Sequence, residues 1–445
     1  MRVLVFAFLS LQLVYAQSVV RISDVEAINP AEVSVAIDPT NPDRIVAASL
    51  QYLPPIGISN VVYVSTDGGK AWVTVKSANP KGLIQGDDSV RFSADGKVYH
   101  SYISFAGIRQ QHPKKAENGI YVVSSTDGGS SWLQPLVVIN HENTVTPFED
   151  KPYLAIDRSN SKHKGTVYIA WTRFDEYGSK ASDCRSHIYF SRSEDGKFSA
   201  PIRISDEPGD CVDSDGTVEG AVPAIGPAGE VYVVWSGPKG LVMDKSTDGG
   251  LTFGKDKVIA EHVGGWDFDI DGISRCNGMP ITAVDLSRSE FRGTLYVNWV
   301  DLRNGDADVF LTYSRDSGRT FAAPVRVNDD TVGNGRPQFF SWMAVDPVDG
   351  AVNIVFYDRR KGEGTETGLT LARSIDGGKT FVNYEIDLKF SCNKEIFFGD
   401  YIGIDAYGGR VVTAFMHFVE PNRLAISSVV FDFEPATQKL KTNRP

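Results

Sequence analysis

The chain has 445 residues, of which 42% are hydrophobic and 23% charged, with 42 glycines and four cysteines. This composition excludes a disordered chain, a collagen-like repeat and a small fold held together by disulfides. Lys and Arg number 45 against 56 Asp and Glu, which gives a net charge of −11. Because an acidic chain repels phosphate backbones, nucleic acid is not an expected partner.

The first sixteen residues have the pattern of a secretory signal peptide. A positive charge at Arg2 precedes a short apolar run that ends at Ala16, before polar Gln17 and Ser18. We therefore expect residues 1–16 to be removed and residues 17–445 to be secreted, or periplasmic in a bacterium. No later window is apolar enough for a membrane span. Export favours disulfides, and four cysteines allow two of them.

A short pattern of Ser, Asp and Gly followed by an aromatic residue returns six times after the N-terminus. Asp can hydrogen-bond the backbone of its own turn, and Gly adopts the positive φ that other residues resist, so each copy predicts a hairpin turn. Successive copies are 53 to 68 residues apart and centre on Asp67, Asp127, Asp195, Asp248, Asp316 and Asp376.

Two further strands recur between these turns, which gives a unit of four antiparallel strands. The second is rich in Val, Tyr and Trp, as in residues 231–235. The last unit lacks a fourth strand, but residues 20–23 have the pattern of one, so the N-terminal strand can close a ring. The sequence thus predicts an all-β, seven-bladed β-propeller as a single domain. The seven first strands begin at Val33, Val90, Tyr153, Val222, Ile281, Trp342 and Ile402.

The repeated pattern Ser-x-Asp-x-Gly-x-Thr, followed by Trp or Phe, resembles the Asp box or BNR repeat of the sialidase superfamily. The copies cover nearly the whole mature chain. The resemblance implies a sialidase-like glycoside hydrolase that removes terminal acidic sugars from glycans, including those of cell-surface glycoproteins. Asp boxes also occur in other proteins, and the early Arg-Ile-Pro motif of sialidases is Arg21-Ile22-Ser23 here. A non-catalytic propeller that binds glycan or protein, and a polysaccharide lyase, remain alternatives.

Propeller topology places the connections between units, and those after each second strand, on the face opposite the Asp turns. We assign to these loops the residues that precede each first strand and the Trp- and Arg-bearing segments that follow each second strand. All four cysteines fall there, and Cys184 with Cys211 is the preferred pair because both lie in the third unit.

Aromatic, acidic and arginine residues in these loops are the candidate site. Guanidinium groups bind carboxylates and aromatic faces stack on sugars. The resemblance implies Arg173, Arg303 and Arg359 as the carboxylate-binding triad, with Trp171 and Trp299 beside the sugar. It also implies Tyr401 or Tyr357 as nucleophile, Glu219 as its partner and Asp150 as the acid. Alternatively, these Arg and Asp residues pair with each other and brace the loops.

One acidic segment imitates the start of a calcium-binding loop. Asp267, Asp269 and Asp271 alternate as the oxygen ligands of such a loop do. The closing Glu is absent because position 278 is Gly, so the alternative is a solvated acidic loop. Apart from this Ca²⁺ hypothesis, no cofactor is expected.

Overall fold

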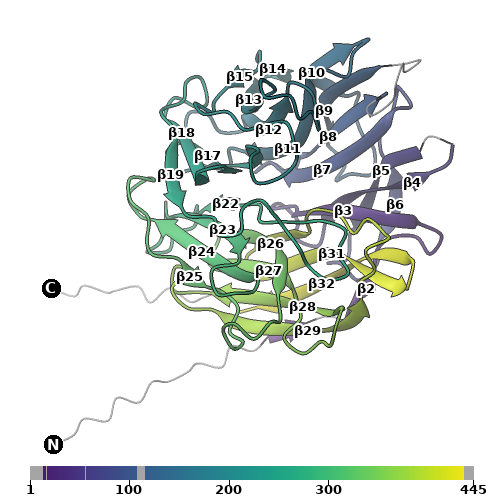
Figure 1. Cartoon of the computed structure of the whole chain (residues 1–445), viewed down its shortest axis with the longest axis vertical. Coiled ribbons are helices and arrows are strands. Elements are labelled where there is room, and N and C mark those ends of the chain that lie inside the picture. Colours follow the sequence, from purple (N-terminus) through teal and green to yellow (C-terminus); the bar gives the residue numbers. More distant parts are fainter. Residues whose placement is uncertain (1–13, 17, 56, 108–115, 435–445) are drawn as a thin grey trace, which may run out of the picture.

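The computed structural model describes residues 14–16, 18–55, 57–107 and 116–434. Seven antiparallel sheets surround a central axis, and the described ranges contain no helix (Figure 1). This confirms the predicted seven-bladed propeller. It follows that the described ranges hold no helix that is long and apolar enough to cross a membrane.

The blades are numbered in chain order, and within each blade the first strand lies nearest the axis and the last strand lies at the rim. Blades 1 to 3 consist of β3 (Ile28–Ile37), β4 (Ile45–Leu53), β5 (Gly57–Ser65) and β6 (Val73–Lys76); β7 (Ile84–Phe92), β8 (Val98–Ala106), β9 (Glu117–Ser125) and β10 (Leu136–Glu142); β11 (Phe148–Ile156), β12 (Val167–Phe174) and β13 (Ser186–Glu194), with β14 (Lys197–Phe198) and β15 (Ile202–Arg203) outermost.

Blades 4 to 6 repeat this order, with a small hairpin, β20 (Asp267–Phe268) and β21 (Cys276–Asn277), inserted between the fourth and fifth. Their strands are β16 (Glu219–Ile225), β17 (Val231–Gly237), β18 (Gly240–Ser246) and β19 (Lys257–Ala260); β22 (Ile281–Val284), β23 (Leu295–Asp301), β24 (Asp308–Ser314) and β25 (Val325–Arg326); β26 (Gln338–Val345), β27 (Val352–Asp358), β28 (Glu366–Ser374) and β29 (Val382–Ser391).

The seventh blade joins the two ends of the chain. It consists of β30 (Gly403–Tyr407), β31 (Arg410–Glu420) and β32 (Arg423–Phe433), and β2 (Val20–Arg21) pairs with β32 as the predicted closing strand. β30 packs beside β3, which completes the ring. β1 (Val14–Ala16) also pairs with β32 and lies within the predicted signal peptide, whose residues 1–13 are outside the described ranges. Cleavage after Ala16 would remove β1 and leave β2 in place.

The repeated turns have the hydrogen bonds that their sequence predicts. In the first, the Ser65 hydroxyl donates to Asp67 Oδ1 at 2.9 Å, and the backbone N–H of Ala71 donates to the same oxygen at 3.0 Å. Gly69 has a φ of 87°, and a Cβ there would lie 2.7 Å from Val430 of the neighbouring blade. Glycine therefore allows both the turn and the close contact between blades.

Candidate functional site

A β-bulge interrupts the innermost strand of five blades near its start. The pairing register shifts at this point in β3, β7, β11, β16 and β26. Bulges redirect side chains, and here they lie at one end of the central channel, which we call the mouth. Within each bulge one residue has a positive φ: Glu32 (56°), Asp87 (56°), Lys151 (49°), Gly220 (74°) and Phe340 (47°).

The inner strands therefore begin earlier than the sequence predicted. Gly86–Asp88 and Glu149–Lys151 lie within β7 and β11, not in loops before them. Trp171, Arg173 and Phe174 likewise belong to β12 rather than to the loop after it. The bulge explains why the starts of β7 and β11 were predicted too late, because an extra residue breaks the alternation of buried and exposed side chains by which strands are recognised.

Lys151 is the centre of the mouth and is almost fully buried. Its Nζ lies 2.8 Å from Glu219 Oε1, 3.4 Å from Asp400 Oδ2 and 3.7 Å from Asp150 Oδ2. Burial alone would lower the pKa of Lys151, but the carboxylates, Glu219 above all, outweigh it and raise the pKa. The residue is therefore a permanent cation held by three carboxyl groups.

Arg275 extends this network towards the hairpin between blades 4 and 5. Its Nε donates to Asp400 Oδ1 at 2.8 Å, and its other edge contacts Asp213 at 3.3 Å. Asp213 also accepts hydrogen bonds from Trp266 Nε1 at 2.8 Å and from the Tyr177 hydroxyl at 3.1 Å. Burial would raise the pKa of Asp213, but the nearby cations lower it to about 2. Asp213 is thus a fixed anion.

A cavity of about 370 Å³ opens beside Lys151 between blades 1 and 3, and we call it the acidic hollow. Glu32, Asp87 and Asp150 line it, together with Lys151, Tyr177 and Arg275. Burial, then Asp400 and Asp87, raises the pKa of Glu32, while burial, then the charge of Asp150, raises the pKa of Asp87. The apolar part of the lining consists of Leu50, Ile58, Ile84, Ile103, Phe105, Phe148 and Phe397.

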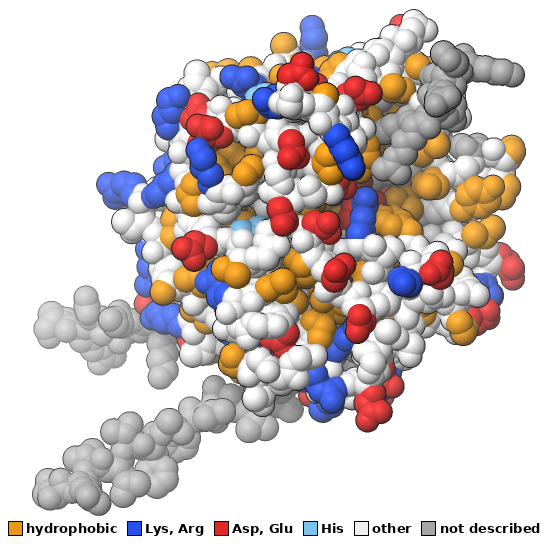
Figure 2. Space-filling model, viewed as in Figure 1, with side chains coloured by type: hydrophobic (Ala, Val, Ile, Leu, Met, Phe, Trp, Pro, Cys, Tyr) orange, Lys and Arg blue, Asp and Glu red, His pale blue; other side chains and the backbone are white. Residues whose placement is uncertain are grey.

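A second cavity of about 290 Å³ adjoins the acidic hollow, because Tyr177 and Arg275 line both. Its other polar residues include Asp213, Asp267 and Asp400. In Figure 2, acidic and basic side chains lie close together around the middle of the ring. The two cavities therefore meet at Tyr177 and Arg275.

The structure brings together two of the four residues predicted to be catalytic. Asp150 and Glu219 both contact Lys151, although Glu219 lies wholly beneath the surface. Tyr401 is buried against Trp342, and its hydroxyl donates to the backbone oxygen of Asp88 at 3.4 Å. Tyr357 in blade 6 is also buried, and its hydroxyl donates to the backbone oxygen of Met416 in the next blade at 2.7 Å.

Arg173 and Trp171, predicted to bind the sugar, share one carboxylate within blade 3. Arg173 Nε donates to Glu149 Oε1 at 2.8 Å, and its guanidinium lies 3.8 Å from the ring centre of Tyr189. Trp171 Nε1 donates to the other oxygen of Glu149 at 2.5 Å. These side chains therefore hold adjacent strands together.

The other two predicted arginines are also paired. Arg303 Nε donates to Asp301 at 2.9 Å, and Trp299 Nε1 donates to the same carboxylate at 2.8 Å. Arg359 is buried and donates to the backbone oxygen of Asp271 at 2.7 Å. The structure thus places the three guanidinium groups in blades 3, 5 and 6, each with its own partners, and does not bring them together.

The acidic segment considered for calcium is extended. Asp267, Asp269 and Asp271 are exposed, while Phe268 and Ile270 between them are buried. Alternate side chains of an extended segment point in opposite directions. Within the described ranges, no group of three or more His, Cys, Asp or Glu side chains is arranged to hold a metal ion.

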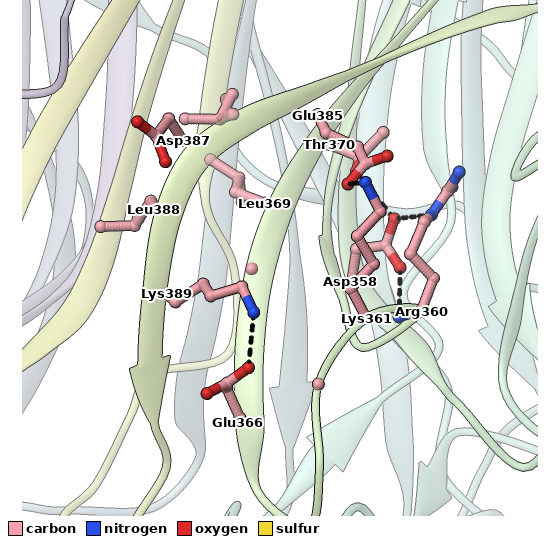
Figure 3. Close-up of a pocket in the computed structure, with 13 residues that line it drawn as sticks. Asp358, Arg360, Lys361, Glu366, Leu369, Thr370, Glu385, Asp387, Leu388 and Lys389 are labelled. Atoms are coloured by element: carbon pink, nitrogen blue, oxygen red, sulfur yellow. Dashed lines mark hydrogen bonds and ion pairs between the residues drawn. The ribbon is translucent and has the colours of Figure 1, made fainter.

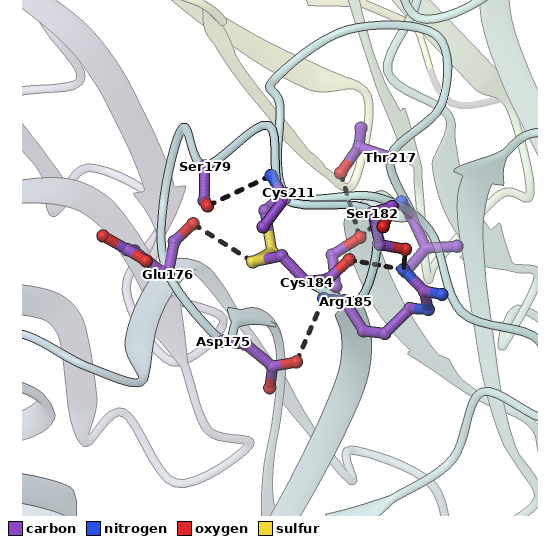
Figure 4. Close-up of a disulfide and its surroundings, with 11 residues drawn as sticks. Asp175, Glu176, Ser179, Ser182, Cys184, Arg185, Cys211 and Thr217 are labelled. Carbon is purple, nitrogen blue, oxygen red and sulfur yellow. Dashed lines mark hydrogen bonds between the residues drawn. A yellow bond between two sulfur atoms is a disulfide. The ribbon is translucent and has the colours of Figure 1, made fainter.

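One disulfide borders the mouth. Cys184 and Cys211 are bonded, with their Cα atoms 5.7 Å apart, which confirms the preferred pair (Figure 4). The backbone N–H of Gly178 donates to the oxygen of Cys211 at 2.7 Å, so the bridge braces the segment that carries Tyr177. The remaining cysteines, Cys276 and Cys392, are buried thiols, and the second disulfide that the count allowed does not form.

A further cavity, of about 310 Å³, lies in blade 6 away from the mouth (Figure 3). Its charged side chains pair with one another: Lys389 with Glu366 at 2.9 Å, and Lys361 with Glu385 at 2.8 Å. These two pairs are exposed, and the buried carboxylate of this cavity, Asp358, already pairs with Arg360 and accepts a hydrogen bond from the Thr370 hydroxyl at 2.7 Å. The mouth is therefore the candidate site.

Sequence reasoning passed over most of the mouth residues. Glu32 was not considered, and Lys151 and Arg275 were seen only as loop residues. A signal for the first two exists, because both stand within two positions of the start of a buried first strand in the repeat. Arg275 has no such signal, since it reaches Asp400, a residue more than a hundred positions away.

Comparison with known proteins supports the fold. No family model matches the chain, and no curated protein matches it. Among solved structures, the chain is similar to a protein of unknown function from Dyadobacter fermentans, with 15% identity and a TM-score of 0.51 over 95% of this chain and 99% of that one. It is also similar to an ulvan lyase, a polysaccharide lyase, with 12% identity and a TM-score of 0.51 over 92% and 94% of the two chains. The NanB sialidase from Streptococcus pneumoniae has 10% identity and a TM-score of 0.48, with 94% of both chains covered. At these identities the likeness shows the fold alone.

Proposed function

We propose that the protein is a secreted glycan-active enzyme, a glycoside hydrolase whose chemistry takes place in the acidic hollow. The observation that carries this proposal is the set of carboxyl groups there. Glycoside hydrolysis needs one protonated carboxyl group to donate to the leaving oxygen and one ionised carboxylate to stabilise or activate the attacking group.

Glu32 fits the role of proton donor. Burial raises its pKa although the charges of Arg275 and Lys151 act against this, and its carboxyl group makes no hydrogen bond or ion pair with the described part of the chain. It also lines the cavity, so a substrate oxygen can reach it. Asp150 fits the role of carboxylate, because it lies in the same cavity and forms an ion pair with Lys151. The sequence had suggested Asp150 as the acid, and this ion pair favours the other role.

The fold is compatible with this chemistry, since the solved structures that the chain resembles include a sialidase and a polysaccharide lyase. Hydrolysis is favoured over a lyase reaction because the hydroxyl of Tyr177, the tyrosine that lines both cavities, donates to the Asp213 carboxylate at 3.1 Å. A tyrosine that an anion holds as a hydrogen-bond donor is a poor base. The disulfide at the mouth supports an exported protein.

The proposal is tested by measuring the release of reducing ends from a panel of neutral, acidic and amino glycans. We expect Glu32→Gln to lower kcat by about a hundredfold or more, as expected for loss of a general acid. Glu366→Gln, which changes an exposed carboxylate in blade 6, is the matched control and should keep full activity.

Three results would decide against parts of the proposal. If no glycan in the panel is cleaved, or if Glu32→Gln is as active as the wild type, the proposed hydrolase is wrong. Release of an unsaturated, ultraviolet-absorbing product would identify a lyase instead. Release of a fluorogenic group from a sialoside would support the acidic-sugar specificity that the resemblance implies.

A further inference from the structure

The charges around the acidic hollow are unevenly matched. The two cations at the mouth, Lys151 and Arg275, form ion pairs with Asp400, and Arg275 also pairs with Asp213. Lys151 also pairs with Glu219 and Asp150. Two cations thus face six carboxyl groups, and of the three that line the hollow, Glu32 and Asp87 form no ion pair within the described ranges.

One buried polar group that lines the hollow also lacks a partner. The Glu32 side chain is 3% exposed, faces the cavity and makes no hydrogen bond with the described residues. Buried polar groups without partners are rare, and a ligand is one explanation for them.

The chemistry of these groups specifies the missing partner. Carboxylates accept hydrogen bonds, and an ammonium group has three N–H donors and no acceptor. The apolar lining of the hollow includes Phe105 and Phe148, whose ring centres are 5.6 Å apart. Such a lining suits the C–H face of a sugar ring, and aromatic faces also attract cations.

We propose that the acidic hollow binds the ammonium group of an amino sugar, so that the substrate is a glycan with free amino groups. This inference rests on the proposed function and specifies its substrate class. An acidic sugar would bring a further negative charge towards Glu32, Asp87 and Asp150. An N-acetylated sugar would present one N–H donor and no charge.

The test is calorimetric titration of the full chain with two oligosaccharides of equal length, a glucosamine tetramer and an N-acetylglucosamine tetramer. We expect the glucosamine tetramer to bind at least about tenfold more tightly, because a charged hydrogen bond contributes roughly 1.5–3 kcal/mol. Spermidine, an amine without a sugar, should bind more weakly than the glucosamine tetramer. Equal binding of the two tetramers, or binding of spermidine as tight as that of the glucosamine tetramer, would overturn the inference.

Variants localise the effect. Asp87→Asn should remove the preference for the amino tetramer, because Asp87 lines the hollow and has no part in the proposed proton transfer, whereas Glu366→Gln should leave it unchanged. If Asp87→Asn alters the fold, as judged by circular dichroism, the comparison of tetramers on the wild type still decides the matter. Cleavage of only neutral or acidic glycans would overturn the inference and leave the proposed hydrolase intact. Selective binding of the amino tetramer without cleavage of any glycan would support the inference and contradict the proposed hydrolase.

Discussion

In the turn between β9 and β10, Asp127 is exposed and accepts hydrogen bonds from Ser131 and Ser125, whereas at the mouth Asp87 is buried beside Asp150. The serine hydroxyls lower the pKa of Asp127 to about 2. Burial and a neighbouring carboxyl group raise the pKa of Asp87. The same side chain is therefore a stable anion at one end of the ring and tends to keep its proton at the other.

The two ends of the ring also differ in whether the same residues recur from blade to blade. Six turns use the same Ser and Asp hydrogen bonds or a shortened form of them, so their contribution to the fold is repeated from blade to blade. The bulges recur in five blades, but the residue with positive φ at the bulge differs in every one: Glu32, Asp87, Lys151, Gly220 and Phe340. A repeated backbone feature with different side chains is a way to build one asymmetric site on a regular ring.

The largest expected effect on the free energy of unfolding comes from replacing Lys151, the buried lysine of the mouth. Replacing Lys151 with Met leaves Glu219 and Asp400 buried without this partner, so Lys151→Met should lower the free energy of unfolding by about 3–5 kcal/mol. Urea denaturation measures this. The control is Lys361→Met, which removes an exposed pair with Glu385 and should cost less than about 1 kcal/mol. Equal losses in the two variants would mean that the mouth network contributes no more than a surface pair.

A smaller effect is expected at the opposite end. Asp127→Ala removes the acceptor of the turn hydrogen bonds and should lower the free energy of unfolding by about 1 kcal/mol, since the turn is exposed. Because the pKa of Asp127 is lowered in the fold, this contribution is present above the unfolded pKa and is lost as pH falls through about 2. Asp269→Ala changes an exposed aspartate outside the turns and should have no measurable effect. Thermal denaturation at neutral pH compares the two.

The smallest expected effect on stability is that of Glu32→Gln, which should increase stability rather than lower it. Because the pKa of Glu32 is raised in the fold, its contribution to stability is fully present below the unfolded pKa and is lost as pH rises through the folded pKa. Glu32→Gln should therefore be more stable than the wild type at pH 8 and no more stable near pH 4. Melting temperatures across this range measure the difference, and Glu366→Gln should follow the wild type. A destabilised Glu32→Gln at pH 8 would contradict the buried, partnerless carboxyl group.

Local patterns predicted most of the fold. The turns and the strands between them depend on residues close together in sequence, and their hydrogen bonds are mostly local, such as Ser65 to Asp67. The closing strand was recognised by its likeness to the fourth strands, although it pairs with β32 at the other end of the chain. The disulfide was also predictable, because Cys184 and Cys211 lie in adjacent loops of one blade. Topology and local chemistry sufficed for these features.

The predicted arginine site shows where local patterns mislead. A Trp, an Asp and an Arg close together were interpreted as a binding motif, yet Trp299 and Arg303 share Asp301 two residues from each. Because the three residues are close in sequence, their side chains can form hydrogen bonds with one another instead of with a ligand. The roles of the predicted residues in binding stay predictions.

The sequence by itself determined a ring of seven four-stranded blades, closed by the N-terminal strand, because each blade is built from short-range periodicity and turn chemistry. Only the tertiary structure decided which charges meet at the mouth. Lys151, Glu219 and Asp400 come from blades 3, 4 and 7, and a bulge aims the lysine at the other two. Such a meeting depends on ring closure and on a backbone irregularity, and neither leaves a periodic signal in the chain.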